Sequence, residues 1–526
     1  MIQPYLWIAI VGGIVAFLVG AGVGMNDLAN AFGTTYGAKI LNLWQICILA
    51  SICEFGGSIS LGGAVTSTIS GGIADTKNFE TEPYLFMYGM LCASCCAFAW
   101  LVFATVYVLP VSSTHSIVGG VIGFGLVHGG GNGVKWAPRQ DSFPFVGGVV
   151  PVIASWFISP TLTGAVAAII YSLIRFLVMR PKNCVNRATY CLPIIILVAF
   201  FLEGFFIMYK GAGKKLKWSI GKALWVAVII GAGAAALSVA FIPLLRRRIR
   251  KLQAREAEAA EAKAREDSEA VDVRSRADED GEIVLEGEPQ NDKQSNGEVV
   301  KAGEVRSATG AVVEVEQSTP VDDDAELEDA VSRASKAEAE EEEYDAEFRA
   351  GIERYNKHAE YVFRFLQVFT AICASFAHGA SDVSNAVGPF AAIYHIYQNK
   401  NLKFGDTEIW ILCIGGAGLV VGLSTFGIRL MRLLGDKITL ITPCRGFSAE
   451  LAAAMVVSFA SAFGIPVSST HCITGGVLAI SICDVGFLNI KWMMVLKLYI
   501  GWIGTLIITA IASAAMYSQG VYAPVE

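Results

Sequence analysis

Long apolar runs, separated by short polar stretches, occupy both ends of this chain of 526 residues. About 20 residues are needed to cross the hydrocarbon core of a bilayer, so apolar runs of about 18 or more predict transmembrane helices. Such runs lie near 5–25, 44–69, 85–109, 147–174, 191–209, 222–244, 362–380, 408–434, 447–464 and 494–516. Two shorter segments with polar starts, 113–128 and 469–485, are either full crossings or halves of re-entrant hairpins. The pattern therefore predicts an all-α polytopic membrane protein with about 12 transmembrane helices.

Charged residues make up only 17% of the chain, and many of them lie in one central stretch between the apolar runs. Alternating acidic and basic residues, with few aromatics, cannot bury enough apolar surface to offset the entropy of an ordered chain. We therefore expect a hydrophilic, largely disordered loop. The predicted organisation is a first transmembrane repeat (1–175), two linking transmembrane helices (176–245), the loop (246–358) and a second transmembrane repeat (359–526).

The hexapeptide Pro-Val-Ser-Ser-Thr-His occurs at 110–115 and again at 466–471, so Ser468 lies 356 positions after Ser112. Proline ends an incoming helix, because it lacks an N–H group and clashes with the preceding turn. Serine and threonine favour the N-cap of the next helix, where their hydroxyls accept unpaired backbone N–H groups. A helix that restarts inside a membrane offers its N–H groups and positive dipole end to an anion. The candidate anion-binding hydroxyls are Ser112, Ser113, Thr114, Ser468, Ser469 and Thr470.

A second motif repeats with nearly the same offset. Asp27 and Asn30, within GMNDLANAFG, lie 355 positions before Asp382 and Asn385, within HGASDVSNAVG. In each copy the acid and the amide share one helical face. One serine motif alone would indicate a kinked pair of packed helices. Two copies beside two acidic motifs indicate instead a substrate site at the interface of two repeats, built from broken helices or re-entrant hairpins at the midplane.

The order of the crossings predicts how the repeats are oriented. Seven crossings precede the central loop, so the second repeat starts on the opposite side of the membrane and the repeats are inverted. Basic residues mark the cytoplasmic side. They cluster after the predicted fifth, seventh and ninth helices, on the side of the loop, although a lysine cluster within 210–217 falls on the other side. We therefore expect a cytoplasmic loop and both termini outside.

Three acidic residues stand inside apolar segments, where a carboxylate is costly and by default marks a functional site. Glu54 and Glu450 are the candidates for function. Glu203 is interpreted as a structural partner of Lys210 or another base, and Asp484, near a helix end, is expected at the membrane interface.

If the two halves fold together, the two acidic motifs meet the two serine–threonine helix starts. Carboxylate, amide and hydroxyl oxygens suit a hard monovalent cation, whereas helix N-termini and hydroxyl donors suit a tetrahedral oxyanion. An anion beside these acids is repelled unless cations bind with it. The residues therefore predict coupled binding of a cation and an anion.

The two acidic motifs resemble the paired signatures of the inorganic phosphate transporter (PiT) family, usually close to G-A-N-D-V-A-N and G-x-N-D-V-S-N. The duplicated PVSSTH is similar to that family's second repeated element, and a large hydrophilic loop is found in its eukaryotic members. The resemblance covers nearly all of the membrane part and none of the loop. Met25 replaces the usual alanine and Ser381 the usual asparagine, so the cation affinity of the second half is expected to differ.

The resemblance implies secondary active symport of inorganic phosphate with Na⁺ by alternating access. H⁺ coupling and transport of another oxyanion are the alternatives. It assigns phosphate to the serine–threonine motifs and to Asn30 and Asn385. The residues that it assigns to the metal ion are Asp27, Asn30, Asp382, Asn385, Glu54 and Glu450. No resident cofactor is implied; the partners are phosphate, Na⁺ and the lipid bilayer, with the plasma membrane as the expected location and a homodimer left open.

Other functional classes are less well supported. A membrane enzyme is disfavoured because no nucleophile–base pair and no HExxH metal motif occurs. Nucleic acid binding has no support, whereas a channel and a phosphate-sensing receptor remain alternatives. His115 and His471, which follow the two serine motifs, are interpreted as structural residues, with proton sensing as the alternative.

Overall fold

The computed structural model describes residues 5–523 except for 110, 142, 144, 207, 210–217, 280–350 and 428–440. The chain forms two compact units, Met1–Ile242 with Glu343–Glu526, and Pro243–Glu342, and each is considered by itself. The described part of the second unit belongs to one long helix, α9 (Ile220–Glu279). The lysine cluster within 210–217, residues 280–350 of the predicted loop (246–358) and the basic residues within 428–440 lie outside the described residues.

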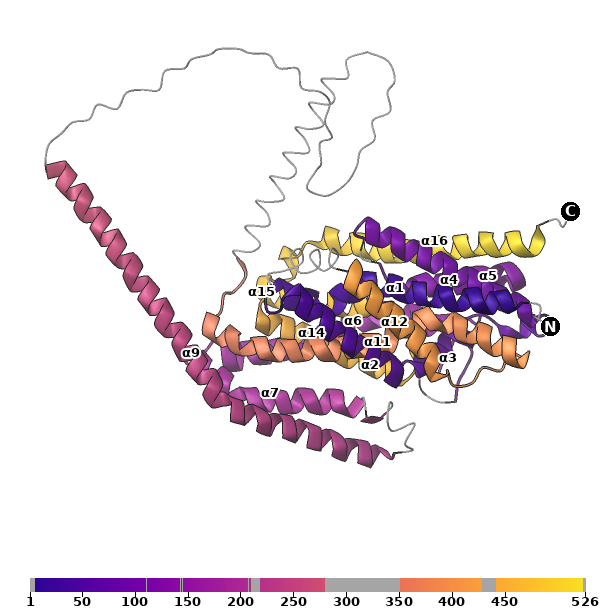
Figure 1. The fold of residues 1–526 in the computed structure, drawn as a ribbon, viewed down its shortest axis with the longest axis horizontal. Coiled ribbons are helices and arrows are strands. Elements are labelled where there is room, and N and C mark those ends of the chain that lie inside the picture. Colours follow the sequence, from indigo (N-terminus) through magenta and orange to yellow (C-terminus); the bar gives the residue numbers. More distant parts are fainter. Residues whose placement is uncertain are drawn as a thin grey trace, which may run out of the picture. The chain divides into compact units, whose positions relative to one another are not determined.

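The described residues of the first unit form helices joined by loops (Figure 1). The only β-structure among them consists of isolated β-bridges. The helices before the loop are α1 (Leu6–Gly37), α2 (Leu43–Leu61), α3 (Gly63–Gly71), α4 (Pro83–Val106), α5 (Ser113–Gly129), α6 (Val149–Ile174), α7 (Cys184–Phe206) and the start of α9. Those after it are α11 (Lys357–Asn399), α12 (Ile409–Thr425), α14 (Pro443–Ala462), α15 (Ser469–Val485) and α16 (Trp492–Tyr522). The all-helical membrane fold predicted from the sequence is confirmed at this level.

Eight helices among the described residues are long and apolar enough to cross a bilayer. They are α1, α2, α4, α6, α7, α9, α11 and α16, and α12 and α15 are shorter apolar helices. The predicted segment 44–69 is divided into α2 and α3, which meet at Gly62. The count of about 12 crossings therefore stays a prediction.

The two helix breaks before the serine motifs have the same geometry. Val108 and Gly464, which are 356 positions apart, both adopt positive φ angles, of 56° and 68°. The incoming helices α4 and α14 end at Val106 and Ala462, four residues before each proline. The left-handed residue thus ends the helix earlier than proline alone would, because it turns the chain out of the helical path. The outgoing helices α5 and α15 then begin at Ser113 and Ser469, with Ser112 and Ser468 at their N-caps as predicted.

Each of these outgoing helices packs on a helix of the other half of the sequence. A Cβ atom added at Gly123 of α5 would fall on the Ala510 carbonyl of α16, and one added at Gly475 of α15 would fall on the Pro160 carbonyl of α6. Figure 1 shows α16 lying along α5. Close backbone contact through small residues is how membrane helices gain packing energy without a hydrophobic driving force.

A partly buried ionic cluster joins the far end of α6 to α15 and to the chain that returns from the loop. Arg175 donates to Glu353 Oε2 through Nε at 2.9 Å and to the Cys483 carbonyl at 2.5 Å. Arg445 donates to Asp484 Oδ2 at 2.6 Å. The Arg180 side chain, together with Arg175, holds the pKa of Glu353 below its usual value.

Asp484 lies one residue before the end of α15, and its expected place at the membrane interface stays a prediction. Its side chain is fully buried, because Arg445 neutralises it and the Tyr171 hydroxyl donates a further hydrogen bond at 2.5 Å. Glu203 is also buried and accepts a hydrogen bond from Ser458 at 3.4 Å, while its expected partner Lys210 lies outside the described residues.

Glycines on α12 bring that helix into backbone contact with α1. A Cβ atom at Gly422 would fall on the Ala21 carbonyl and within 2.8 Å of the Ala21 Cα atom, whereas a Cβ atom at Gly504 of α16 meets nothing within 4 Å. We expect Gly422→Ala to lower the unfolding free energy by about 1–3 kcal/mol through overpacking. Thermal unfolding of the purified chain in detergent measures this. Gly504→Ala is the control, and equal melting temperatures for the two variants would contradict the packing argument.

Candidate functional site

The two acidic motifs lie in the middle of continuous helices. α1 continues to Gly37 instead of ending near residue 25, and α11 runs unbroken from Lys357 to Asn399. Asn, Asp and Gly are poor helix formers in isolation, but packing of α1 against α11 and α12 overrides their propensities. Asp27 and Asp382 are consequently buried, with 0% and 1% of their surfaces exposed.

In the first half, the acid binds the serine of its own half, and the amide reaches the helix start of the other half. Ser113 Oγ donates to Asp27 Oδ2 at 2.8 Å. Asn30 Nδ2 lies 2.9 Å from Asp27 Oδ1, 3.3 Å from Ser469 Oγ and 2.9 Å from Thr470 Oγ1. Asn30 therefore links α1 to the N-terminus of α15.

The second half repeats the same contacts. Ser469 Oγ donates to Asp382 Oδ2 at 2.9 Å. Asn385 Nδ2 lies 3.1 Å from Asp382 Oδ1, 3.3 Å from Ser113 Oγ and 3.1 Å from Thr114 Oγ1. The two halves thus exchange the same pair of contacts, and the term hydroxyl–amide cluster is used below for Asp27, Asn30, Ser113, Thr114, Asp382, Asn385, Ser469 and Thr470.

The serines that precede the two helix starts are buried beside this cluster. Ser112 Oγ accepts from the His115 N–H group at 3.4 Å and so caps α5, whereas Ser468 makes no side-chain cap. The first N–H groups of any helix lack partners within it. The cluster therefore combines carboxylates, amides and hydroxyls with the N-termini of α5 and α15.

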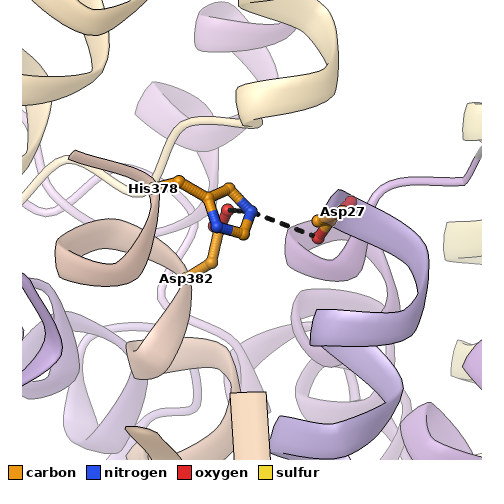
Figure 2. Close-up of side chains that lie close together, drawn as sticks. All are labelled: Asp27, His378 and Asp382. Atoms are coloured by element: carbon orange, nitrogen blue, oxygen red, sulfur yellow. Dashed lines mark ion pairs between the residues drawn. The ribbon is translucent and has the colours of Figure 1, made fainter. Parts of the chain in front are cut away.

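His378 stands between the acids, and nothing in the repeat pattern assigned it a role. Its Nε2 atom lies 2.8 Å from Asp382 Oδ2 and 3.8 Å from Asp27 Oδ2 (Figure 2). Its Nδ1 atom lies 3.1 Å from Glu54 Oε1. Asp27, His378 and Asp382 bring ligand atoms within 4.8 Å of one another. The position 355 residues earlier is Val23, so this histidine makes the two halves chemically unequal.

Glu54 and Glu450 occupy different environments. Glu54, on α2, is 1% exposed, and its carboxylate makes no hydrogen bond to any residue that the structure describes. Its link to the hydroxyl–amide cluster is the contact with His378, which is an ion pair when the imidazole is protonated. The structure thus brings Glu54 to the cluster, as an acid whose oxygens are not occupied by protein donors.

Glu450, on α14, lies in a separate pocket of hydroxyl groups. Thr34 and Thr35 of α1 donate to Oε1, the latter at 2.9 Å, and Thr370 of α11 donates to Oε2 at 2.9 Å. Thr34 is two helical turns beyond Asp27 on α1, which corresponds to about 10 Å. The structure therefore does not bring Glu450 to the other predicted metal ligands.

Sequence reasoning missed His378 and the threonines around Glu450. The difference between Val23 and His378 at equivalent positions of the two motifs was a usable signal for the histidine. The threonines carry no such signal, because Thr and Ser occur throughout apolar helices and bond to their own helix backbone. His115 and His471, which were interpreted as structural residues, have ring centroids 4.8 Å apart and pack on Trp156 and Trp502.

Comparison with known proteins places this geometry in a family. A sequence model of the phosphate transporter family matches residues 23–513. The phosphate-repressible phosphate permease pho-4 of Neurospora crassa is 31% identical over 593 aligned positions, which cover 100% of this chain and 99% of that protein. Sodium-dependent phosphate transporter 2 of Homo sapiens is 29% identical over 662 positions, covering 99% of each.

A solved structure shares the fold. The structure described as "The sodium-dependent phosphate transporter" matches with a TM-score of 0.70 and 26% sequence identity, covering 99% of this chain and 100% of that chain. Together with the family match over most of the chain, this likeness shows that the protein belongs to the phosphate transporter family. The resemblance noted from the motifs is confirmed, as is the prediction of a membrane transporter rather than an enzyme.

The pocket around Glu450 generates a test of its own. Thr370→Val removes one donor from the buried carboxylate, and we expect a loss of about 1–3 kcal/mol of unfolding free energy. The same substitution made together with Glu450→Gln should cost less, because a neutral amide depends less on that donor. Thermal unfolding of the four proteins of this double-mutant cycle measures the coupling. Thr425→Val is the control, since Thr425 bonds only to carbonyls of its own helix. Additive effects would contradict the assignment.

Proposed function

We propose that the protein moves inorganic phosphate together with Na⁺ across the membrane. The observation that carries this proposal is the exchange of contacts in the hydroxyl–amide cluster, where each asparagine reaches the serine and threonine of the other half. The relatives named as sodium-dependent phosphate transporters support the choice of both ions.

The charges of the site support a cation requirement. A carboxylate oxygen of Asp27 lies within 4.8 Å of one of Asp382, beside His378. Two like charges at that separation repel by on the order of 3 kcal/mol at an effective dielectric constant of about 20. The carboxylates and the Asn385 Oδ1 atom, which has no hydrogen-bond partner among the described residues, are oxygen ligands suited to Na⁺. The proposed Na⁺ ligands are Asp27, Asn30, Asp382, Asn385 and Glu54. Glu450 is kept as a separate candidate for a cation.

The starts of α5 and α15 support the proposed binding of an anion. Ser113, Thr114, Ser469 and Thr470 present hydroxyls beside the N-termini of α5 and α15, where backbone N–H groups and the helix dipole favour negative charge. Two of these hydroxyls now donate to the aspartates. When Na⁺ occupies the aspartate oxygens, the hydroxyls are released to donate to phosphate, so we propose that Na⁺ binds first.

The paths of α5 and α15 support inverted repeats. α15 runs alongside α6 in the same direction, because Ser155 lies 3.5 Å from the Pro466 carbonyl and Arg175 lies 2.5 Å from the Cys483 carbonyl. α5 instead leads toward the start of α6, where the Val149 N–H group donates to the Lys135 carbonyl. The far ends of α5 and α15 thus lie at opposite ends of α6, which is about 39 Å long.

This arrangement favours alternating access, in which one repeat bundle rocks against the other around the shared site. Two Na⁺ ions with one dihydrogen phosphate carry one net positive charge. The membrane potential then contributes about 2.3 kcal/mol per elementary charge for each 100 mV or so.

The membrane topology belongs to the same proposal. We place about 12 crossings in the plasma membrane, with the central loop in the cytoplasm, both termini outside and a homodimer as the alternative to a monomer. The contact of Glu353 with Arg175 and Arg180 supports this, because it joins the end of the loop to the basic residues that follow α6.

One observation favours H⁺ as the alternative coupling ion. His378 lies between Asp382 and Glu54, where a proton on the imidazole would neutralise part of the acidic charge without Na⁺. Uptake of radiolabelled phosphate into proteoliposomes separates the two cases. An inward Na⁺ gradient should drive phosphate accumulation, and an equal K⁺ gradient should not. Accumulation driven by a pH gradient alone would show that H⁺ is the coupling ion instead of Na⁺. Downhill equilibration without accumulation would indicate a channel.

The two aspartates provide the sharpest mutational test. Asp27→Asn and Asp382→Asn keep the side-chain shape but remove the charge that binds the cation, so each should reduce Na⁺-driven phosphate uptake to background. Asp406→Asn, which changes an exposed acid in a loop, should leave uptake unchanged. Uptake is normalised to the amount of reconstituted protein. Wild-type rates in either site variant would refute the assignment.

A further inference from the structure

A cavity of about 550 Å³ lies beside the turn that leads into the second serine motif. Its walls come from the end of α3, the segments 135–140 and 146–148 and the start of α6, and its floor includes Gly464, Ile465 and Pro466. The cavity is far larger than the space of about 20 Å³ that adjoins Asn30, His378 and Ser469 in the hydroxyl–amide cluster.

The floor of this cavity is continuous with the central site. Pro466 lines the cavity and is followed at once by Val467, whose carbonyl lies 3.4 Å from Thr114 Oγ1 of the first serine motif. Thr68, on the wall, donates to the Gly464 carbonyl at 2.8 Å. Only one turn of backbone thus separates a molecule in the cavity from the central hydroxyls. The hydrogen bond from Thr68 holds this turn to the cavity wall.

The lining carries two positive charges and no acid. Lys135 and Arg139 both face this space, together with uncharged polar residues such as Thr76 and Gln140, whereas the hydroxyl–amide cluster contains aspartates and no Lys or Arg. Burial lowers the pKa of Lys135. Its ammonium group makes one hydrogen bond among the described residues, to the Gly71 carbonyl at 2.9 Å, although an ammonium has three donors.

Lys135 also belongs to a third element that repeats between the two halves of the sequence. Lys135-Trp136 recurs as Lys491-Trp492, and both tryptophans donate through Nε1 at 2.9 Å to the carbonyl five residues earlier. Around Lys491 the cavity is only about 20 Å³. The same turn therefore stands beside an open space in one half of the protein and a nearly closed one in the other.

We propose that the cavity of Lys135 and Arg139 is an entry vestibule that binds phosphate before it passes the Gly464–Pro466 turn to the hydroxyl–amide cluster. This inference rests on the proposed phosphate transport. The two cations attract the anion to the mouth of a site whose own charge is negative, and the free donors of Lys135 and the Arg139 guanidinium hold it. In the opposite conformation, the turn of Lys491 takes the equivalent place at the other face.

Phosphate protection of an introduced cysteine tests the vestibule without relying on transport. Gln140→Cys places a thiol in the lining, and the full-length chain in lipid nanodiscs is treated with an anionic or a cationic methanethiosulfonate of similar size. The rate for the unsubstituted chain, which has 12 cysteines of its own, is subtracted. The anionic reagent should react faster by about tenfold, and inorganic phosphate should slow it.

Charge variants in the same background show whether the two cations are responsible. Arg139→Gln with Lys135→Gln should abolish both the preference for the anionic reagent and the phosphate protection, while Arg139→Lys with Lys135→Arg should retain them. Lys77→Gln is the matched control, because Lys77 is an exposed neighbour that does not line the cavity. Equal rates for the two reagents in the unaltered lining, or rates unaffected by phosphate, would overturn the vestibule.

Uptake kinetics supply the functional readout. In proteoliposomes, neutralising Lys135 and Arg139 should raise the half-saturating phosphate concentration about tenfold and change the maximal rate little. The charge-retaining pair should behave like the parent chain, which rules out misfolding as the cause. An unchanged half-saturating concentration would overturn the vestibule even if Na⁺-driven uptake is intact. Absence of any phosphate uptake by the parent chain would instead refute the proposed function, whatever the labelling shows.

Discussion

The fold is organised around buried carboxylates that are held by hydroxyl groups and amides instead of by basic residues. Asp27 and Asp382 each accept a hydrogen bond from a serine at the start of a broken helix, and each neighbouring asparagine bridges to the opposite half. The carboxylates thus have hydrogen-bond donors, yet His378 is the only basic side chain in ion-pair contact with them in the described part of the chain. Because a buried negative charge is costly, the site has a physical reason to bind cations, and bound cations give it a physical reason to bind an anion.

The sequence was most informative where chemistry repeats. The recurrence of Asp27, Asn30 and the serine motif at one offset predicted which side chains meet, and the N-caps at Ser112 and Ser468 followed from known helix-start preferences. The prolines were less informative, since Val108 and Gly464 end the helices before the prolines are reached. Helix lengths were underestimated because α1 and α11 continue through motifs of low helix propensity, where tertiary packing decides.

Other parts of the site were beyond sequence reasoning because they depend on which helices touch. Glu450 resembles Glu54 as an acid in an apolar helix, but only the packing of α14 against α1 and α11 surrounds it with threonines. Asp484 on α15 is buried because Arg445, at the start of α14, donates a hydrogen bond to its carboxylate. The surroundings of the symmetric cluster are therefore asymmetric. His378 stands where the first half has Val23. One lysine–tryptophan turn borders a large cavity, and its counterpart borders a small one.

Phosphate binding to the purified chain as a function of Na⁺ tests the central claim most directly. The measurement uses the protein in lipid nanodiscs at constant ionic strength, with choline replacing Na⁺. Saturating Na⁺ should lower the dissociation constant for phosphate at least tenfold, which corresponds to about 1.4 kcal/mol of binding free energy. Phosphate should favour Na⁺ binding by the same free energy, summed over the bound Na⁺ ions, because coupling between sites is reciprocal. Equal phosphate affinity with and without Na⁺ would contradict the account.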